Sequence, residues 1–455
     1  MLFEKYNKIS VIGAARSGIA VSKLLKSKGY SVLLSDSGDA EKIYVEFIDK
    51  IRSLNIDYEF GKHSEKIFEC DLMVVSPGVS QNSELIRKAN EKKIDVVSEI
   101  EAASWFAKGK LLAITGTNGK TTTTMLTGKI FEDAGYKTFV CGNIGVAFSE
   151  IVEQTDDESI IVLETSSFQL DNIKSFKPLI ASLINITPDH LDRYENSADK
   201  YADSKKRIAE NQDENNFLVY NSDDEVVIQK VKDLHRPKRV PVSISEDLSN
   251  VFDIAAYLDR DMLTFTYELG TERILDRNEL SIKGEHNVYN SLFSIANAKL
   301  MGVASESVRK SLKDFKGVEH RLEFVRDVNG VKFYNDSKAT NVNSVWYAIR
   351  GFDVPLVLIL GGKDKGNDYS LIENEVKKHV KQIVAVGESK MKVYEFFRNI
   401  CPVIIAKDFE DCIYKAATEA SKNEVVLFSP ACASFDMFEN FEHRGKEFKR
   451  IVNSL

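Results

Sequence analysis

Residues 111–124 read LLAITGTNGKTTTT, and this stretch decides the fold of the middle of the chain. The apolar residues 111–114 predict a short buried strand, Gly116 and Gly119 predict a tight loop, and the pattern after Lys120 predicts a helix. Glycines let a loop point several backbone N–H groups inward, and the start of a helix adds partial positive charge. This order of strand, loop and helix favours the binding of a nucleoside triphosphate.

The predicted phosphate-binding loop is made of Gly116, Thr117, Asn118, Gly119, Lys120, Thr121 and Thr122. We expect Lys120 to reach the β- and γ-phosphates and Thr121 to help hold Mg²⁺. Ile114 stands where such loops usually have their first glycine, so the loop is expected to be tighter. A plain turn with a surface lysine is the alternative, and the order of the three elements disfavours it.

Length and composition limit the class of protein. The 455 residues suggest about three domains, and the contents of 43% hydrophobic and 29% charged residues are ordinary for a soluble globular protein. The net charge of −8 argues against bulk nucleic-acid binding. No apolar run approaches the length of a membrane span, and the N-terminus lacks the apolar core of a signal peptide. The five scattered cysteines contain no C-x-x-C pair, so we expect a reduced, cytoplasmic protein that binds neither nucleic acid nor membrane.

The first segment, residues 1–98, has the layout of a dinucleotide-type fold. Strands are predicted at 8–12 and 31–34, the first followed by GAARSG at 13–18 and the second by Asp36. A third strand at 72–75 leads into a turn. Ligands bind at the carboxyl ends of such strands, and the candidate contacts are Gly13, Ser17, Asp36, Ser76, Pro77 and Gly78. The occupant stays open between NAD, another diphosphate and no ligand at all.

The second segment, residues 99–317, adds polar groups beside the phosphate loop. Predicted strands at 160–163 and 179–186 run into Glu164 and into the sequence TPDHLD at 187–192. A carboxylate at the end of a buried strand near a phosphate loop is a natural ligand of Mg²⁺ or organiser of water. His190 is a metal ligand, a polar clamp or a structural histidine. Asp223 and Asp224 predict the solvated start of a helix.

The third segment, residues 318–455, again alternates strands and helices. Strands are predicted at 356–360, 383–386 and 425–428, and the polar run NDSKATN at 335–341 follows an apolar strand and predicts a ligand loop. The fold class is therefore α/β with three domains. We expect a Rossmann-like N-terminal domain, a central domain with the parallel or mixed sheet of phosphate-loop ATPases, and a Rossmann-like C-terminal domain.

Several separate motifs together resemble one family, the Mur ligases, over all three segments. They are TGTNGKTT at 115–122, GNIG at 142–145, ETSSFQL at 164–170, TPDHLDR at 187–193, GEHNVYN at 284–290 and EHRLE at 319–323. NDSKATN at 335–341 and SPACASFDMFENFEHRG at 429–445 are similar to the branch that adds D-glutamate. The resemblance implies an enzyme of peptidoglycan precursor synthesis. Its reaction is the ATP-dependent addition of D-glutamate to the L-alanine carboxylate of UDP-N-acetylmuramoyl-L-alanine, through an acyl phosphate and a tetrahedral intermediate, with release of ADP and phosphate.

The resemblance also implies roles for individual residues. Lys120 and Thr121 bind ATP, Glu164 ligates Mg²⁺, and His190 lies beside a second ion. Asn143 contacts the muramoyl substrate, Asn287 lies near the adenine, and Arg321 and Asp336 contact the ribose and phosphates. The residues implied to grip D-glutamate are Lys338, Thr340, Lys365, Ser434 and Phe441. A monomer is expected, with a third domain that closes over the second before the amide forms.

Lys205 is implied to carry a carbamate that ligates Mg²⁺, because a free ammonium would be repelled by two metal ions. The sequence alone favours an exposed helical lysine at this position. The chain departs from its relatives at two other places: no arginine follows Asp36, so the hold on the uridine diphosphate stays open, and Lys363 stands where some relatives have aspartate.

Three alternative functions stay open from the sequence. A sibling ligase or a folylpolyglutamate-type synthetase shares TGTNGKT but does not explain the blocks at 335–341 and 429–445. A nucleotide-dependent oxidoreductase would favour a complete G-x-G-x-x-G fingerprint. A non-enzymatic nucleotide-binding regulator would predict the loss of Lys120, Glu164, His190 or Lys338, and all four are present.

Overall fold

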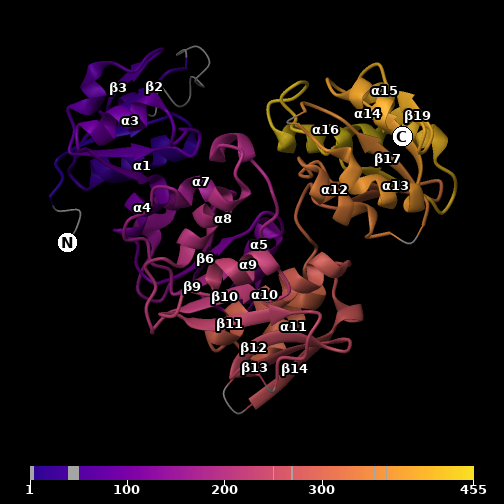
Figure 1. Cartoon of the computed structure of the whole chain (residues 1–455), viewed down its shortest axis with the longest axis horizontal. Helices are drawn as coiled ribbons and strands as arrows, with labels where there is room; N and C mark the ends of the chain where they lie inside the picture. Colours follow the sequence, from indigo (N-terminus) through magenta and orange to yellow (C-terminus); the bar gives the residue numbers. More distant parts are fainter. Residues whose placement is uncertain (1–4, 39–50, 250, 268–269, 353, 365) are drawn as a thin grey trace. The chain divides into compact units, whose positions relative to one another are not determined.

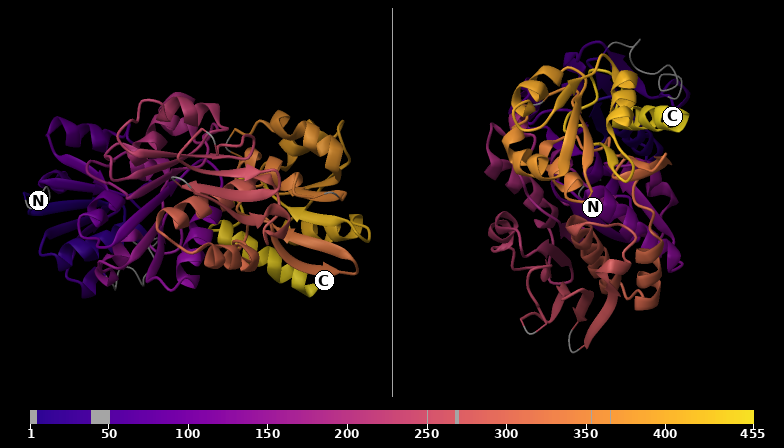
Figure 2. Two further views of the ribbon diagram at one scale, coloured as in Figure 1. Left: turned by 90° about the horizontal axis from the view of Figure 1, so that it is seen from below. Right: turned by 90° about the vertical axis from the view of Figure 1, so that its right-hand side faces the viewer.

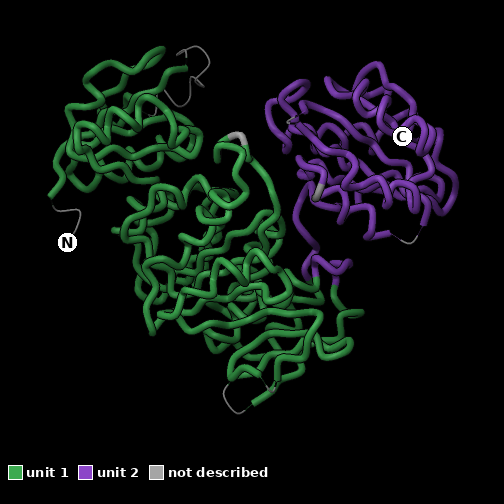
Figure 3. Tube along the Cα trace, in the orientation of Figure 1, with its two compact units in different colours: residues 1–280, 288–314 green, residues 281–287, 315–455 purple. Residues whose placement is uncertain are grey.

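The computed structural model describes residues 5–38, 51–249, 251–267, 270–352, 354–364 and 366–455. The chain forms two compact units, drawn in green and purple in Figure 3. Unit 1 comprises residues 1–280 and 288–314, and unit 2 comprises residues 281–287 and 315–455. Unit 1 contains the first two β-sheets of the chain and unit 2 contains the third (Figure 1). The three domain ranges expected from the sequence stay a prediction.

The first sheet of unit 1 has five parallel strands in the order β3-β2-β1-β4-β5. Its elements are β1 (Lys8–Ile12), α1 (Arg16–Ser27), β2 (Ser31–Asp36), β3 (Asp57–Phe60), η2 (Glu65–Phe68), β4 (Leu72–Val75), α3 (Glu84–Glu91), β5 (Asp95–Ser98) and α4 (Glu99–Ser104). Successive residues of β4 pack into different apolar clusters, Leu72 and Val74 into one, Met73 and Val75 into the other. Because side chains alternate along a strand, these two clusters lie on opposite faces of the sheet. Helices cover both faces (Figure 2). The predicted Rossmann-like sheet is confirmed.

The second sheet has nine strands in the order β14-β13-β12-β11-β10-β9-β6-β8-β7. The strands from β7 to β12 pair in parallel, and β12, β13 and β14 form an antiparallel meander, so the predicted mixed sheet is confirmed. The strands are β6 (Lys110–Thr115), β7 (Thr138–Gly142), β8 (Ile160–Glu164), β9 (Ile180–Leu183), β10 (Phe217–Asn221), β11 (Lys238–Ser243), β12 (Ile254–Asp259), β13 (Met262–Tyr267) and β14 (Gly270–Asp276).

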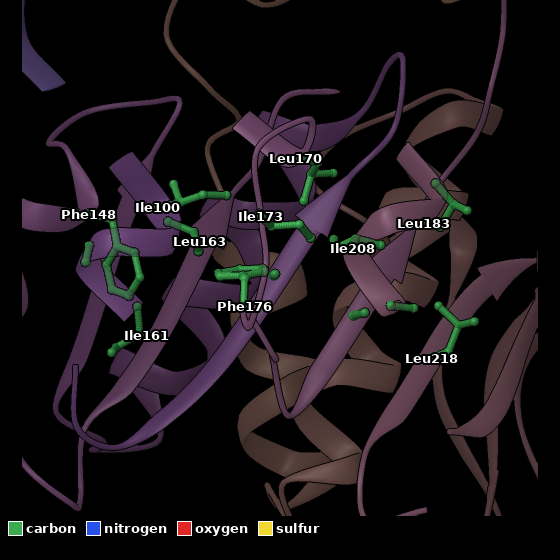
Figure 4. Close-up of a cluster of buried hydrophobic side chains, with 14 of the residues drawn as sticks. Ile100, Phe148, Ile161, Leu163, Leu170, Ile173, Phe176, Leu183, Ile208 and Leu218 are labelled. Carbon is green, nitrogen blue, oxygen red and sulfur yellow. The ribbon is translucent and has the colours of Figure 1, made fainter. Parts of the chain in front are cut away.

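Helices and apolar side chains surround this sheet. The helices are α5 (Lys120–Asp133), α6 (Phe148–Ile151), η3 (Val152–Gln154), α7 (Ser167–Leu170), η4 (Leu191–Tyr194), α8 (Ala198–Lys206), η5 (Arg207–Ala209), α9 (Glu225–Val231), η6 (Arg277–Glu279), α10 (Glu285–Leu300) and α11 (Ser305–Asp314). Leu163 of β8, Leu183 of β9 and Leu218 of β10 share one buried cluster with Phe176, which lies before β9 (Figure 4). This cluster anchors the strands whose carboxyl ends carry the polar residues described below.

The third sheet, in unit 2, has six strands in the order β15-β16-β20-β17-β18-β19. Only β15 is antiparallel to its neighbour, and Leu356 and Leu358 of β17 pack on one face while Val357 and Ile359 pack on the other. The elements are β15 (Glu323–Val328), β16 (Val331–Asn335), α12 (Val342–Ile349), β17 (Leu356–Leu360), η7 (Tyr369–Ile372), α13 (Glu373–His379), β18 (Val380–Ala385), α14 (Lys390–Phe397), β19 (Val403–Ile405), α15 (Phe409–Glu419), β20 (Val425–Phe428) and α16 (Phe441–Ser454).

Strand ends are where the sequence-based expectations and the structure differ most. The strand expected over residues 179–186 is too long, because β9 ends at Leu183 and the backbone then leaves the sheet beside the phosphate loop. The helix start expected at residues 223–225 is confirmed, since the Asp224 side chain accepts a hydrogen bond from Val227 N at 3.0 Å and caps α9. In the described part of the chain, no helix is both long and apolar enough to cross a membrane.

Candidate active site

The phosphate-binding loop lies between β6 and α5, as the sequence predicts. Gly119 is the N-cap of α5 and has a φ of 84°, a conformation that favours glycine. A Cβ atom at Gly119 would lie 2.4 Å from Asn290 Oδ1 of α10, so space as well as conformation requires glycine here. The loop and the first turn of α5 therefore approach a neighbouring helix closely.

Asn185 holds this loop in shape, although no role for it was predicted from the sequence. Its Oδ1 accepts hydrogen bonds from Thr117 N at 3.0 Å and Asn118 N at 2.9 Å, and its Nδ2 donates to Asn118 O at 3.1 Å. Thr117 Oγ1 in turn donates to Thr187 O at 3.0 Å. The available signal was one amide side chain inside the apolar run LINI at 183–186, at the end of a strand next to the loop.

Lys120 and Lys205 meet at one backbone carbonyl. Nζ of each lysine donates to Gly116 O at 2.8 Å, and Lys120 Nζ also donates to Thr117 O at 2.8 Å. Lys205 is on α8 and is only 1% exposed, so the expectation of an exposed lysine from the sequence alone was wrong. Burial, reinforced by the positive charge of Lys120, lowers the pKa of Lys205 well below its usual value. Its amine is therefore shifted toward the neutral, nucleophilic form.

Glu164 is the last residue of β8 and is 1% exposed. Its Oε1 accepts a hydrogen bond from Asn143 Nδ2 at 2.9 Å, so the structure brings these two predicted site residues together. Its Oε2 is buried and has no hydrogen-bond partner among the described residues. A buried carboxylate oxygen without a donor is costly unless a cation or another donor meets it, so this oxygen suits a metal ion.

His190 follows β9 and opens η4 with a left-handed φ of 51°. Its ring packs edge-on against Phe168 with centroids 5.1 Å apart, and its Nε2 lies 3.6 Å from Asp189 Oδ2. The side chain is 38% exposed, which leaves its imidazole accessible. Within the described ranges no three His, Cys, Asp or Glu side chains gather as a ready metal site.

The loops at the carboxyl ends of β1 and β4 meet in unit 1. Ser76 Oγ donates to Gly13 O at 3.4 Å. A Cβ atom at Gly13 would lie only 2.6 Å from Ser76 Oγ. Asp36 accepts hydrogen bonds from Ala14 N at 2.6 Å and Gly38 N at 2.7 Å, so both of its oxygens bind backbone. Ser17 is half-buried in the first turn of α1.

The β4 turn, residues 76–79, is held from the middle of the chain. Arg193 donates to Pro77 O at 2.8 Å and to Val79 O at 2.7 Å, and Gly78 between them has open space at its Cα. Arg193 belongs to the TPDHLDR block, but no role for it was predicted from the sequence.

Asp336 is the buried centre of the predicted site in unit 2. It follows β16, and its side chain accepts hydrogen bonds from Ser429 Oγ at 2.7 Å and Leu322 N at 3.3 Å. Burial raises the pKa of Asp336 to about 6, and the nearby Arg321 acts in the opposite direction. Arg321 also acts with burial to lower the pKa of His286 to about 3. Asn287 donates from Nδ2 to Lys283 O at 2.8 Å, at the start of α10.

The other predicted residues of unit 2 lie on two loops and the start of α16. Lys338 Nζ lies 4.5 Å from the centre of the Phe441 ring, and Thr340 N donates to Lys338 O at 2.9 Å. Ser434 is 2% exposed and follows β20. Lys365 lies outside the described residues.

Arg444 ties these loops together and was also missed. It is fully buried in α16, donates from Nε and Nη2 to Ser337 Oγ and O at 3.0 and 2.7 Å, and donates from Nη1 to Cys432 O at 3.0 Å. Its charge has no carboxylate hydrogen-bonded to it in these contacts, and burial lowers its pKa to about 10. The sequence offered only an arginine beside a glycine in a helical pattern, which gives no sign of burial.

The fold and the site together indicate the class of protein. The chain is an α/β protein with a glycine-loop nucleotide site, a buried lysine and carboxylate beside it, and a second set of cationic and hydroxyl side chains in unit 2. Models of the MurD N-terminal domain, the Mur ligase middle domain and the glutamate ligase domain of Mur ligases match residues 8–85, 114–298 and 320–432. The chain therefore belongs to the Mur ligase family, in its UDP-N-acetylmuramoylalanine--D-glutamate ligase branch.

Curated relatives match over nearly the whole length. The chain is 43% identical to the UDP-N-acetylmuramoylalanine--D-glutamate ligase of Chloroherpeton thalassium, covering 99% of each protein. It is 42% identical to the ligase of the same name from Salinibacter ruber, covering 98% of each. The ligase of that name from Thermoanaerobacter sp. is 41% identical, with 99% of each chain covered.

Solved structures share the fold at low sequence identity. A pseudomurein peptide ligase type C from Methanothermus fervidus matches with a TM-score of 0.61 at 19% identity, covering 98% of this chain and 99% of that one. The UDP-N-acetylmuramate-alanine ligase MurC from Thermotoga maritima matches with a TM-score of 0.60 at 17% identity, covering 99% of both chains. The MurF ligase from Thermotoga maritima in complex with ADP matches with a TM-score of 0.58 at 13% identity, covering 93% and 95%.

Proposed function

We propose that the protein joins D-glutamate to the L-alanine carboxylate of UDP-N-acetylmuramoyl-L-alanine, using ATP, in peptidoglycan precursor synthesis. The observation that carries this proposal is the grouping of Lys120, Lys205 and the unpartnered oxygen of Glu164 around the phosphate loop. It occurs in a chain that is 43% identical over its length to a ligase named for this reaction.

The reaction proceeds in two balanced steps. A carboxylate oxygen of the substrate attacks the γ-phosphorus of ATP, the bond to ADP breaks, and an acyl phosphate forms. The amine of D-glutamate then attacks the acyl carbon, a tetrahedral intermediate forms, and phosphate leaves as the amide is made. Negative charge develops at the transferred phosphoryl group and on the acyl oxygen, and preorganised cations and N–H groups stabilise it.

In this mechanism Lys120 and the N-terminus of α5 act on the phosphates. Lys120 Nζ now donates to two loop carbonyls, Gly116 O and Thr117 O, so a bound triphosphate would draw it to a stronger, charged acceptor. Thr121, in the first turn of α5, is 5% exposed and supplies a hydroxyl beside the phosphates. Asn287, Arg321 and Asp336 in unit 2 are proposed to contact the adenosine part.

Mg²⁺ would be held by Glu164, Thr121, His190 and a carbamate on Lys205, and when bound it neutralises charge on the phosphates. The unpartnered Oε2 of Glu164 and the lowered pKa of Lys205 fit this assignment. A neutral amine is the form that adds CO₂, and the resulting carbamate places a negative charge next to the positive charge of Lys120. Two ions are proposed.

The amino-acid site is proposed on unit 2. D-Glutamate carries two carboxylates, which require cations and hydroxyl donors. Lys338, which lies over the Phe441 ring, is proposed to provide them together with Thr340 and Ser434, and Lys365, outside the described residues, is proposed to add a second cation.

The sugar nucleotide is proposed to bind at the ends of β1 and β4 in unit 1, on Gly13, Ser17, Asp36, Ser76, Pro77 and Gly78, with Asn143 at the muramoyl group. Since backbone N–H groups occupy both oxygens of Asp36, its main contribution is to shape the turn after β1. We also propose a monomeric, cytoplasmic enzyme, which agrees with five unpaired cysteines.

Phosphate release from ATP tests the proposal directly. The assay contains Mg²⁺ and UDP-N-acetylmuramoyl-L-alanine, and compares D-glutamate with L-glutamate, L-lysine and L-alanine. Release that depends on D-glutamate, together with the matching amide product, is expected. Release with another amino acid would move the chain to a sibling reaction, and no release with any of them would favour the regulator alternative.

A further inference from the structure

Two arginines join the loops of the first sheet to the loops of the second sheet within unit 1. Arg193, from η4 of the second sheet, reaches the β4 turn, residues 76–79. Arg16, the first residue of α1, reaches in the opposite direction and donates to Gly145 O in the GNIG sequence. Each arginine therefore donates to at least one backbone carbonyl of a loop that belongs to the other sheet.

Arg193 binds the β4 turn through two nitrogens of its guanidinium group. Nη1 donates to Pro77 O at 2.8 Å and Nη2 donates to Val79 O at 2.7 Å. These two nitrogens form the planar fork that distinguishes arginine from lysine, and the two carbonyls flank Gly78. One side chain thus fixes both ends of the turn proposed to bind the sugar nucleotide.

The same guanidinium is also linked, through Phe168, to His190 of the proposed phosphoryl-transfer site. Its Cζ lies 4.0 Å from the centre of the Phe168 ring, and the same ring contacts the edge-on imidazole of His190, at 5.1 Å, and the stacked ring of Tyr194, at 6.1 Å. A cation over an aromatic face is attracted electrostatically by the ring. The β4 turn, Arg193, Phe168 and His190 therefore form one continuous set of contacts.

Arg16 makes the corresponding link on the other side. Gly145 belongs to the loop that carries Asn143, and Asn143 Nδ2 donates to Glu164 Oε1 at 2.9 Å. The loop after β1 is thereby connected, through the GNIG loop, to the carboxylate proposed to hold Mg²⁺.

We propose that Arg193 and Arg16 are a reciprocal pair of positioning residues that set the sugar-nucleotide loops against the phosphoryl-transfer residues. This role rests on the proposed function, because the two steps require the substrate carboxylate to lie within reach of the γ-phosphate. Placement errors of about 1 Å in such a geometry cost about a hundredfold in rate. Neither arginine touches the reacting atoms in this proposal.

The decisive experiment measures binding and turnover of Arg193→Gln in the full chain. Calorimetry is expected to show at least about tenfold weaker binding of UDP-N-acetylmuramoyl-L-alanine, the scale of one lost hydrogen bond from a charged donor. Binding of ADP is expected to stay within about twofold of wild type, because the phosphate loop keeps its contacts. Arg193→Lys should recover only part of the loss, since an ammonium cannot span both carbonyls in one plane.

Arg309→Gln is the matched control. Arg309 lies on α11 in the same unit and also donates to a backbone carbonyl, Ile274 O at 2.7 Å, but it is not part of either loop. It is expected to keep wild-type affinity for the sugar nucleotide. If Arg309→Gln lost as much affinity for the sugar nucleotide as Arg193→Gln, the effect would be a general consequence of removing a carbonyl-bound arginine. That result would overturn the proposal.

Arg16→Gln and the double variant test reciprocity. If both arginines act on one junction, the double variant should lose less affinity than the product of the two single losses. Losses that multiply, or an Arg193→Gln protein with unchanged sugar-nucleotide affinity, would contradict the pair. Wild-type protein that neither binds this substrate nor releases phosphate would instead refute the proposed function, so the two failures are distinguishable.

Discussion

At the scale of single residues, the two lysines at Gly116 O have different tasks although they share one acceptor. Lys120 is the first residue of α5 and is proposed to bind the phosphates, whereas Lys205 is a buried residue of α8. The difference comes from burial, which lowers the pKa of Lys205 and disfavours its charge, whereas Lys120 is the group proposed to meet the nucleotide. The sequence places Lys120 in the glycine-bearing loop, but nothing near Lys205 in the sequence indicates its burial.

Replacement of Lys120 by alanine is expected to lower kcat by at least about a hundredfold, the scale of one lost transition-state donor. Lys129→Ala is the matched control, because Lys129 is on the same helix and pairs with Asp133 at 2.8 Å. Steady-state phosphate release measures both variants. Near-wild-type turnover of Lys120→Ala would refute the assignment of the phosphate loop.

Asp336 predicts a pH dependence of stability. Burial raises its pKa from 3.8 to about 6, so the folded protein binds this proton more tightly than the unfolded chain does. Its contribution is fully present below pH 3.8 and is lost as the pH rises through 6, by up to about 3 kcal/mol. Asp336→Asn should remove this loss, so the variant gains free energy of unfolding relative to wild type between pH 4 and pH 7.5.

Denaturant unfolding of the two proteins at several pH values measures that difference, and taking the difference cancels the groups they share. A difference that stays constant from pH 4 to pH 7.5 would show that Asp336 titrates alike in both states. Nucleotide affinity of the same variant separates its role in stability from its proposed role in binding.

At the scale of elements, α16 organises the proposed amino-acid site through Arg444. Three hydrogen bonds connect this helix to the loops that follow β16 and β20. Arg444→Met should therefore leave three acceptor bonds unmade, lower the free energy of unfolding by about 2–5 kcal/mol and raise the KM for D-glutamate more than the KM for ATP.

Arg450→Met provides the comparison for this prediction. Arg450 is on the same helix but is exposed and pairs only with Glu447, three residues away, at 2.7 Å. We expect it to change stability by less than about 0.5 kcal/mol and neither KM. Equal effects of the two substitutions, measured by thermal unfolding and steady-state kinetics, would argue against the organising role of Arg444.

The strands show how much of the elements the sequence could predict. The bounds 356–360 and 425–428 were predicted correctly, because each is a continuous apolar run buried on both faces. The expected strand at 179–186 was too long, because hydrophobicity continues through Ile184 and Ile186 after the pairing ends. Where a chain leaves a sheet depends on its neighbours, and here Asn185 binds the phosphate loop instead of extending the strand.

At the scale of the whole molecule, the proposed ATP contacts are divided between the two compact units. Lys120 belongs to unit 1, and Arg321 and Asp336 belong to unit 2, as does Lys338 of the proposed D-glutamate site. The proposed reaction requires all of them at one place, so we predict that the units close around the substrates. Small-angle scattering should show a smaller radius of gyration with nucleotide and sugar nucleotide bound than without them. An identical scattering profile would count against closure.

The sequence by itself determined the fold class, the family and most of the proposed site, because glycine loops, apolar runs and motif blocks are local patterns. Tertiary structure alone decided which charged residues are buried and what they contact across the sheets. Lys205 was expected from the sequence to be exposed, but α8 packs it against Gly116 O. Arg193 and Arg444, to which the sequence assigned no role, reach carbonyls more than a hundred residues away. Burial and long-range hydrogen bonds arise only when distant segments pack together, so no local pattern records them.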